Sequence, residues 1–468
     1  MALPTSVQKY LEKQSITFQV SEELRLASLS CANTEDSLDP AKVGKLILLQ
    51  DSLGIMQVLI PANAILDLTS LCELLGRNLQ ALKPEDQEEL LNRLGVEQLP
   101  AIPQLMEYET VIEQKLLELP EIYLHSGEND SYVRLNQEQF KVLVSNSSLC
   151  HFSNPVDPII QAINSECLEG DEKQITQAVE QFTSLRIKQR LVNTLEIPPM
   201  PESAEKIIKL RVDPNAGIGE LAKVVETDPS LAAQVVSWAA SPFYAAPGKI
   251  TSVHDAVVRV LGFDLVINLA LGLALGKTLD LPKDGPQGVT PYWQQAVYSA
   301  TTMEAMVKKM PDETRPYIGM AYLSGLLNNF GYLVLSHVFP PHFSLICRYM
   351  ECNNHYAHHI IEHQVIGVSR EQIASWLMSA WNMPDEIITA LRWQKHPQYK
   401  DEMCVYANLL YLSNQWLRRC GVGDGPVEDI PQELYDRLGL TPELAEEAIN
   451  SVMERSDHIA VMAKNLSG

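Results

Sequence analysis

The first 150 residues alternate short apolar runs with longer amphipathic segments. The runs KLILLQ (45–50) and MQVLIPA (56–62) have strand length, and the turn-like DSLG between them predicts a β-hairpin. Helical spacing follows in LDLTSLCELLG (66–76) and in PEDQEELLNRLG (84–95), which has Pro near its start and Gly at its end. A second strand pair around GEND and a following helix are predicted at 122–127, 131–136 and 136–146. The pattern predicts an N-terminal α/β or α+β domain.

From about residue 158 the strand signals fade and the pattern becomes helical. Residues 158–190 predict a helical connector, and the Pro-rich IPPMPES (197–203) is the best candidate for a domain boundary. In DPSLAAQVVSWAAS, Asp228 suits an N-cap and Pro229 the first helical position, where its missing N–H costs nothing. The stretch TPELAEEAINSVMERS near the C-terminus opens in the same way. The remainder of the chain is therefore predicted to be all-α.

Length and charge narrow the function classes. A chain of 468 residues is too long for one ordinary core, and 46% hydrophobic with 20% charged residues is typical of globular proteins. The net charge is −23 (36 − 59); residues 1–185 contribute 12 − 28 = −16 and the rest 24 − 31 = −7. Nucleic-acid binding depends on Lys and Arg that neutralise phosphates, so this balance argues against it, most strongly for the N-terminal part.

The sequence predicts a cytoplasmic protein. Its start, MALPTSVQKYLEKQ, lacks the basic-then-apolar layout of a signal peptide. The most apolar run, VINLALGLALG (266–276), covers only about half a membrane span and predicts a buried helix. The 8 cysteines are scattered without a CxxC pair, as in reduced core positions. No membrane association is expected.

The chain from IPPMPES onward resembles the HDOD domain, the HD-related output domain of bacterial signalling proteins. The resemblance covers roughly residues 190–415 and begins with Ile-Pro-x-x-Pro and the DPSLAAQVV helix. It continues in an I-x-S-x-x-x-A-x-x-x-LG run made of Ile250, Ser252, Ala256, Leu261 and Gly262. Later landmarks are YWQQA (292–296), AYLSGLLNNFG (321–331), EHQVIG (362–367) and AWNMPDEIITALRWQKHP (380–397). An S-x-x-Y motif begins at Ser241, and the Asn that the family has before this Ser is Ala240 here.

HDOD domains resemble HD phosphohydrolases, which use His and carboxylate ligands to hold divalent metal and activate water. The resemblance places the ligand positions of those enzymes on Gln295, Asn328, Asn329, Arg370, Gln394 and Lys395. Amides are neutral, weak ligands, and Arg or Lys opposes a cation. We therefore expect a degenerate HD site without metal or cofactor and without a catalytic role.

A rival metal site is the His-rich stretch HYAHHIIEHQ (355–364). On a helix, His355, His359 and His363 would share one face, and His pairs four residues apart can bind zinc. His358 lies beside them. The simpler interpretation is a polar, partly exposed helix face, because no HExxH motif is formed and no carboxylate is placed to act as a base.

Residues 5–152 resemble a second family, the YbaK/prolyl-tRNA editing fold, which includes deacylases of mischarged tRNA. The similarity lies in KYLEKQSITFQV, in GKLILLQDSLGIMQVLIPANAILDLTSLCELLG and in EIYLHSGENDSYVRLNQEQFKVL. It places Lys45 on the lysine near the substrate ester, where a cation stabilises developing negative charge, and Ser126 and Gly127 on the substrate-facing turn. The family's glycine-rich loop is represented by QLPAIPQL (98–105), which lacks the glycines that allow close backbone approach.

Together these observations predict an editing-like α/β domain followed by an all-α HDOD domain. The predicted divisions are an editing-like domain at 1–152, a helical connector at 153–195, an HDOD domain at 196–415 and a C-terminal helical extension at 416–468. The favoured function is a non-catalytic bacterial signalling or regulatory protein, with signalling proteins and a small-molecule ligand as partners and tRNA disfavoured. The alternative is an aminoacyl-tRNA deacylase with an HDOD appendage. A metal-dependent phosphohydrolase is a third, weaker alternative.

Overall fold

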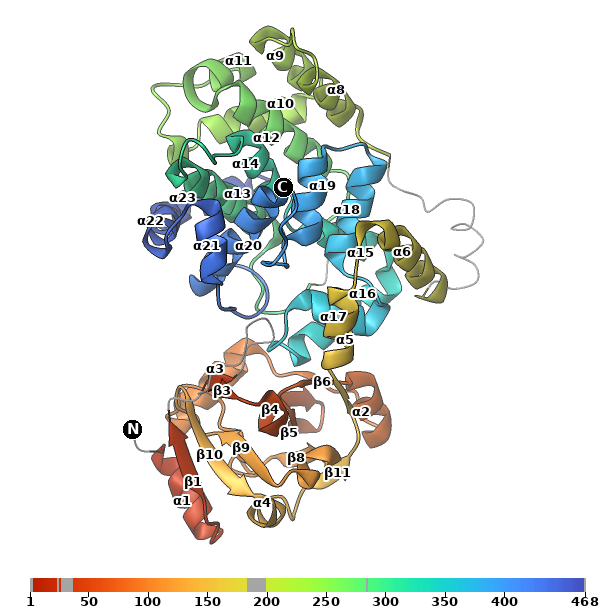
Figure 1. The fold of residues 1–468 in the computed structure, drawn as a ribbon, viewed down its shortest axis with the longest axis vertical. Coiled ribbons are helices and arrows are strands. Elements are labelled where there is room, and N and C mark those ends of the chain that lie inside the picture. Colours follow the sequence, from red (N-terminus) through yellow and green to blue (C-terminus); the bar gives the residue numbers. More distant parts are fainter. Residues whose placement is uncertain (1–2, 23–24, 27–36, 183–198, 283–284, 467–468) are drawn as a thin grey trace. The chain divides into compact units, whose positions relative to one another are not determined.

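The computed structural model describes residues 3–22, 25–26, 37–182, 199–282 and 285–466 (Figure 1). The chain forms two compact units, each of which draws on several chain segments. Unit 1 comprises Met1–Ser165, Gly285–Gly288 and Ser344–Gln364. Unit 2 comprises Glu166–Asp284, Val289–Phe343 and Val365–Gly468.

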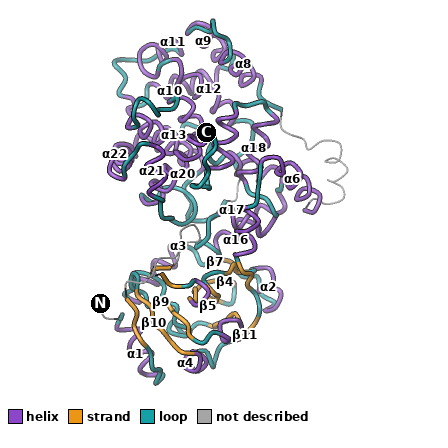
Figure 2. The backbone as a smooth tube through the Cα atoms, in the orientation of Figure 1, coloured by secondary structure: helices purple, strands orange, loops and turns teal. Residues whose placement is uncertain are grey.

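Unit 1 is built on a mixed sheet, drawn as orange strands in Figure 2. The predicted hairpin is confirmed: β4 (Val43–Asp51) and β5 (Gly54–Pro61) pair antiparallel. The second predicted pair is also confirmed, as β9 (Glu121–His125) and β10 (Ser131–Asn136). The order is β1-β10-β9-β4-β5-β8-β11, with β7 also paired to β4. The other strands of this sheet are β1 (Gln19–Glu22), β7 (Gln80–Ala81), β8 (Glu109–Glu113) and β11 (Ser148–Cys150).

Short strands and helices complete the first part of unit 1. Two small strand pairs are β6 (Ala64–Leu66) with β12 (Ser153–Pro155), and β2 (Arg25–Leu26) with β3 (Ser37–Leu38). Its helices are α1 (Thr5–Lys13), α2 (Leu68–Leu75), α3 (Pro84–Leu94), α4 (Gln137–Leu143) and α5 (Asp157–Asn164). The helices predicted at 66–76, 84–95 and 136–146 are thus confirmed. Asp67 caps α2 by accepting from the Ser70 amide, and Gly95 ends α3 in the left-handed conformation.

A segment from much later in the chain belongs to unit 1. We call residues 344–364 the return segment; it holds the end of α16 (Pro340–Cys352) and most of α17 (His358–Ile366). The Asn353 side chain accepts from the Leu66 amide (2.7 Å) and donates to the Leu66 carbonyl (3.2 Å), as a neighbouring strand would. The Tyr349 hydroxyl donates to Asp67 (2.7 Å) and that of Tyr356 to the Ala62 carbonyl (2.7 Å). Buried, satisfied polar contacts of this kind fix the return segment to β6 and α2.

Unit 2 is all-α, as predicted for this part of the chain. Asp228 caps α10 through the Ser230 and Leu231 amides, and Thr441 caps α22 through the Leu444 amide. The helices are α6 (Leu168–Phe182), α8 (Glu202–Arg211), α9 (Ile218–Glu226), α10 (Pro229–Ala239), α11 (Val253–Ala256), α12 (Phe263–Gly276), α13 (Tyr292–Lys309), α14 (Ile318–Leu326), α15 (Phe330–Val338), α18 (Arg370–Ala380), α19 (Asp385–Trp393), α20 (Cys404–Arg419), α21 (Gln432–Leu438), α22 (Pro442–Met453) and α23 (Ser456–Lys464).

The connector predicted over 158–190 appears as two helices, α5 in unit 1 and α6 in unit 2. Its end, and the first residues of the boundary predicted at 197–203, lie outside the described residues. Helix α6 is held within unit 2 by buried charge: Arg392 of α19 pairs with Asp171 and with Glu166 (2.7 Å).

Two apolar stretches form the core of unit 2. Every residue of α12 from Leu265 to Gly276 is buried, which confirms the buried helix predicted at 266–276. The stretch Ile318–Val338 is long and apolar enough to cross a membrane, but 83% of it is buried inside the protein. It is divided into α14 and α15 by a turn at residues 327–329. This stretch is therefore core, and its turn carries the first residues of the candidate site.

Candidate functional sites

The turn between α14 and α15 presents Asn328 and Asn329, and two glycines allow it to pack tightly. A Cβ added to Gly325 would lie 2.6 Å from the Cα of Ala300 in α13, and one added to Gly331 would lie 2.0 Å from the carbonyl oxygen of Arg370. Any larger residue would force these backbones apart. The sequence GLLNNFG therefore places the two amides against α13 and the start of α18.

Arg370 connects this turn to a loop near the C-terminus. Its Nη1 donates to Asn329 Oδ1 (2.8 Å) and to Asp424 Oδ2 (2.9 Å), while the other oxygen of Asp424 lies 3.5 Å from Nη2 of Arg418. Asn329 Nδ2 in turn approaches Gln295 Oε1 (3.4 Å). Asp424 is thus a counter-ion shared by two guanidinium groups that are 4% and 9% exposed.

A second chain of amides lies on the other side of the turn. Gln394 Nε2 donates to the Asn328 carbonyl (2.8 Å), and Asn328 Nδ2 donates to Asn414 Oδ1 (3.3 Å). Lys395 follows Gln394, and burial lowers the pKa of its ammonium; Arg418 and Arg370 lower it further, while Asp424 and Glu371 act in the opposite direction. The ammonium lies where its charge is poorly solvated.

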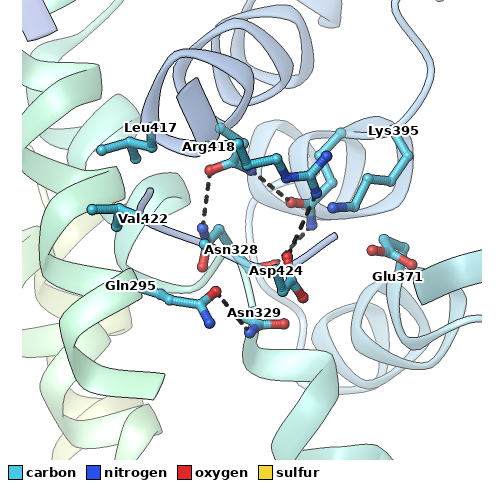
Figure 3. A pocket seen from close by; sticks show the side chains of 12 residues that line it. Gln295, Asn328, Asn329, Glu371, Lys395, Leu417, Arg418, Val422 and Asp424 are labelled. Carbon is cyan, nitrogen blue, oxygen red and sulfur yellow. Dashed lines mark hydrogen bonds and ion pairs between the residues drawn. The ribbon is translucent and has the colours of Figure 1, made fainter. Parts of the chain in front are cut away.

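These side chains surround a small cavity (Figure 3). The space open to the centre of a water molecule inside the cavity is about 20 Å³, and one water needs about 10–15 Å³. The cavity therefore holds little more than a single water. The structure brings Gln295, Asn328, Asn329, Gln394 and Lys395 to the lining, and Arg370 pairs with two lining residues. The site residues placed by resemblance therefore converge.

Sequence analysis missed the remaining lining residues. They are Glu371, Asn414, Leu417, Arg418, Val422, Gly423 and Asp424. A signal for Asp424 was present in GVGDGP (421–426), where Gly421, Gly423 and Gly425 all adopt positive φ (76°, 132° and 87°). An acidic residue set among such glycines indicates a specific loop conformation.

The site does not fit the metal of HD phosphohydrolases. Amides occupy four of the expected ligand positions, and Arg370 and Lys395 place cations at the other two. Within the described ranges, no three His, Cys, Asp or Glu residues are grouped so that they could hold a metal ion. The predicted sharing of one helix face by His355, His359 and His363 is wrong, because α17 begins only at His358 and His355 precedes it.

A different site lies in unit 1 around Lys45 of β4. Strand β9 pairs parallel with β4 through Gly44 and Leu124, so Lys45 and His125 follow side by side. Burial lowers the pKa of Lys45. Ser126 is fully buried, and its Oγ accepts from the Glu128 amide (3.3 Å). Gly127 has φ +103° and leaves only 3.1 Å between an added Cβ and Val96, so this turn requires glycine.

Two histidines accompany Lys45. Burial and then the Lys45 charge lower the pKa of His125 to about 4, and its Nδ1 accepts from the Gly127 amide (3.1 Å). Burial and then the Lys45 charge also lower the pKa of His355, to about 3. The contact of its Nε2 with the Ala64 carbonyl (3.4 Å) acts in the opposite direction and raises the pKa. Both rings are therefore neutral at pH 7. His355 belongs to the return segment, so sequence analysis of the editing-like region could not find it.

The loop 98–105, which lacks the family's glycines, is fastened to the same turn. Ala101 donates its amide to the His125 carbonyl (2.8 Å), and the Gln98 amide donates to the Gly127 carbonyl (3.1 Å). The loop without the family's glycines is therefore held against the turn by backbone hydrogen bonds.

The two units define a class: an editing-like α/β domain combined with an HD-like helical domain. The family model for the HDOD domain matches residues 197–397, and that for the aminoacyl-tRNA editing domain matches residues 26–143. A crystal structure from Marinobacter aquaeolei VT8, of a protein with a proposed role in signal transduction, is 43% identical and similar over 100% of both chains with a TM-score of 0.89. The chain therefore belongs to the HDOD family, in its form with an N-terminal editing-like domain.

More distant relatives match parts of the chain. An HDOD domain protein of unknown function from Geobacter sulfurreducens is 18% identical, covers 63% of this chain and 97% of its own, and has a TM-score of 0.46. An uncharacterized protein of Treponema pallidum (strain Nichols) is 21% identical over 240 residues, which span 51% of this chain and 45% of that relative. The chain thus spans less than half of this curated relative.

Proposed function

We propose that this chain is a non-catalytic regulatory protein of a bacterial signalling system, acting in the cytoplasm through partner proteins. The observation that carries the proposal is the Arg370–Asp424–Arg418 network: Arg370 stands at a position where HD enzymes would hold a metal ligand, and it is paired with an Asp424 carboxylate that Arg418 shares. A guanidinium paired in this way cannot activate water for hydrolysis. The combination of domains, and the role proposed for the Marinobacter protein, support the same class.

Metal content tests the proposal directly. Protein purified without chelators should contain no stoichiometric transition metal and should not hydrolyse phosphate esters above background. Asn328→Ala serves as the matched variant, because Asn328 lines the cavity. One or more tightly held metal ions per chain that are lost in Asn328→Ala would overturn the proposal.

For unit 1 we propose a binding site for a small carboxylate-bearing molecule. Among the described residues Lys45 makes no ion pair or hydrogen bond, so a ligand carboxylate would supply its missing counter-ion. Neutral His125 and His355 beside it can donate or accept hydrogen bonds. Transfer RNA is a poor candidate, because residues 1–185 carry 28 acidic and 12 basic residues, and each missing phosphate contact forgoes affinity.

Mischarged tRNA separates this proposal from its alternative, a deacylase. We expect no tRNA binding in the low-micromolar range at physiological salt and no deacylation across a panel of mischarged tRNAs. Small carboxylates should raise the thermal stability of the wild type but not of Lys45→Met. Deacylation that disappears in Lys45→Ala, or tRNA affinity that falls in Lys45→Glu, would favour the deacylase.

A further inference from the structure

Three basic and two acidic side chains gather around the cavity of unit 2. Arg370, Lys395 and Arg418 come from the start of α18, the turn after α19 and the end of α20. Lys395 and Arg418 line the cavity, and Arg370 pairs with the lining residues Asn329 and Asp424. Two carboxylates face them, Glu371 and Asp424. The guanidinium groups of Arg370 and Arg418, 4% and 9% exposed, share the single carboxylate of Asp424. A dianion in the place of that carboxylate would match the two cations more closely.

Asp424 serves as the main internal anion of the cavity. It contacts two of the three cations, and it is carried by a loop rather than by a helix. The loop is attached to unit 2 through Thr290, whose hydroxyl accepts from the Gly423 amide (2.9 Å). Without Asp424 the two guanidinium groups would lose the carboxylate that they share, and its space would be added to the present cavity. A small dianion would then match the charge.

Two hydrogen-bond acceptors at the cavity indicate that the dianion must also carry a hydrogen-bond donor. Glu371 is 4% exposed, and its Oε2 is buried without a hydrogen-bond partner, as is Oδ1 of Asn328. A buried acceptor without a donor is destabilising, and a carboxylate oxygen more so. A ligand that satisfies the site must therefore offer oxyanion acceptors to three cations and at least one O–H donor to Glu371. Sulfate has no such donor, whereas hydrogen phosphate has one.

We propose that the cavity binds inorganic hydrogen phosphate, which replaces the Asp424 carboxylate between Arg370 and Arg418 and donates its O–H to Glu371. Arginine pairs recognise tetrahedral oxyanions through several parallel N–H groups, and Lys395 adds a point charge. Asp424 is then a built-in competitor, and phosphate binding displaces the loop 421–426. The inference concerns a site and a ligand that the regulatory role does not by itself require.

Calorimetric titration of the full chain at about pH 8 and constant ionic strength tests the proposal, because hydrogen phosphate is then mainly a dianion that keeps one O–H. Asp424→Asn removes the internal anion and should raise phosphate affinity about tenfold. Asp280→Asn, an exposed site in the same unit, is the matched control and should leave it unchanged. Arg418→Gln, introduced together with Asp424→Asn, should return the affinity to the wild-type value or below.

Selectivity separates hydrogen phosphate from other anions. Asp424→Asn should bind phosphate at least about tenfold more tightly than sulfate or methyl phosphate, which are dianions without the acidic O–H. In the wild-type chain, Glu371→Gln should reduce this preference, because an amide can itself donate to the anion. This second variant keeps the test valid if Asp424→Asn does not fold. Equal affinity of Asp424→Asn and wild type, or equal binding of phosphate and sulfate, would overturn the proposal.

Discussion

Both units bury positive charge, but they compensate it differently. In unit 2, Arg370 and Arg418 share Asp424, and Arg392 is paired with Asp171 and Glu166. In unit 1, Lys45 stands beside two neutral imidazoles and has no carboxylate partner among the described residues. Paired cations of this kind stabilise a structure only as long as both partners remain, whereas an unpaired cation costs stability and attracts an anion. The paired arginines of unit 2 therefore stabilise the fold, whereas Lys45 of unit 1 is a candidate for binding an anionic ligand.

The largest loss of stability should come from removing the paired cation Arg392 of unit 2. Arg392→Met leaves two carboxylates, 4% and 3% exposed, without their cation, and should lower the free energy of unfolding by about 3–5 kcal/mol. Chemical denaturation followed by circular dichroism measures the loss. Lys206→Met is the control, because its pair with Glu202 is exposed to solvent and contributes little to stability. A similar small loss in both variants would contradict the assignment.

An intermediate effect is expected where the return segment joins unit 1. Asn353→Ala leaves the buried N–H and C=O of Leu66 without their side-chain partners and should cost about 1–3 kcal/mol. Amide hydrogen exchange should accelerate at Leu66 and throughout residues 344–364. The neighbouring Asn354 is exposed, so Asn354→Ala should change neither rate. Unchanged exchange in Asn353→Ala would show that other contacts hold the segment.

Acidification should weaken unit 1 before it affects most carboxylates. The folded-state pKa values of His125 and His355, about 4 and about 3, lie below the ordinary value of 6.5, so the unfolded chain binds protons that the folded chain does not. Their contribution is complete above about pH 6.5 and is lost as the pH falls toward the folded values. The thermal midpoint should therefore drop between about pH 6.5 and pH 5. His125→Gln should flatten this slope, whereas the exposed-site variant His254→Gln should leave it unchanged.

The smallest expected change in stability is a gain, in Lys45→Met. Lys45→Met removes a partly buried cation that has no ion pair or hydrogen bond among the described residues, so stability should stay the same or rise by up to about 1 kcal/mol. Lys42→Met, close by on the same chain segment, removes a half-exposed pair with Glu121 and should lower stability by up to about 1 kcal/mol. Thermal or chemical denaturation of both variants gives the comparison. A clear loss in Lys45→Met would mean that this residue is structural.

The sequence was most informative where local chemistry decides structure. Asp67, Asp228 and Thr441 cap helices because their side chains reach the first free amides, and DSLG turns the β4–β5 hairpin. The resemblance to HD enzymes located five lining residues of the cavity, and Arg370 beside it, because helix packing around Gly325 and Gly331 preserves their arrangement.

Long-range contacts were beyond such local signals. Asp424 lies outside the region that matches the HDOD model, and its role depends on Arg370, 54 positions away in the chain. His355 lies 291 positions from Ala64, and no pattern in either segment indicates that they meet. The charge of a residue can be read from sequence, but its compensation depends on which distant residue packs beside it.

The return segment also bears on how such a protein can arise by recombination. In chain order the residues of the two units alternate: 1–165, 285–288 and 344–364 form one, and 166–284, 289–343 and 365–468 the other. A single crossover between residues 165 and 344 would therefore transfer the editing-like sheet without Asn353, Tyr349 and His355. Leu66 would lose its side-chain partner, and Lys45 its second neighbouring imidazole. A fragment that ends anywhere between residues 165 and 364 would carry an incomplete version of at least one unit.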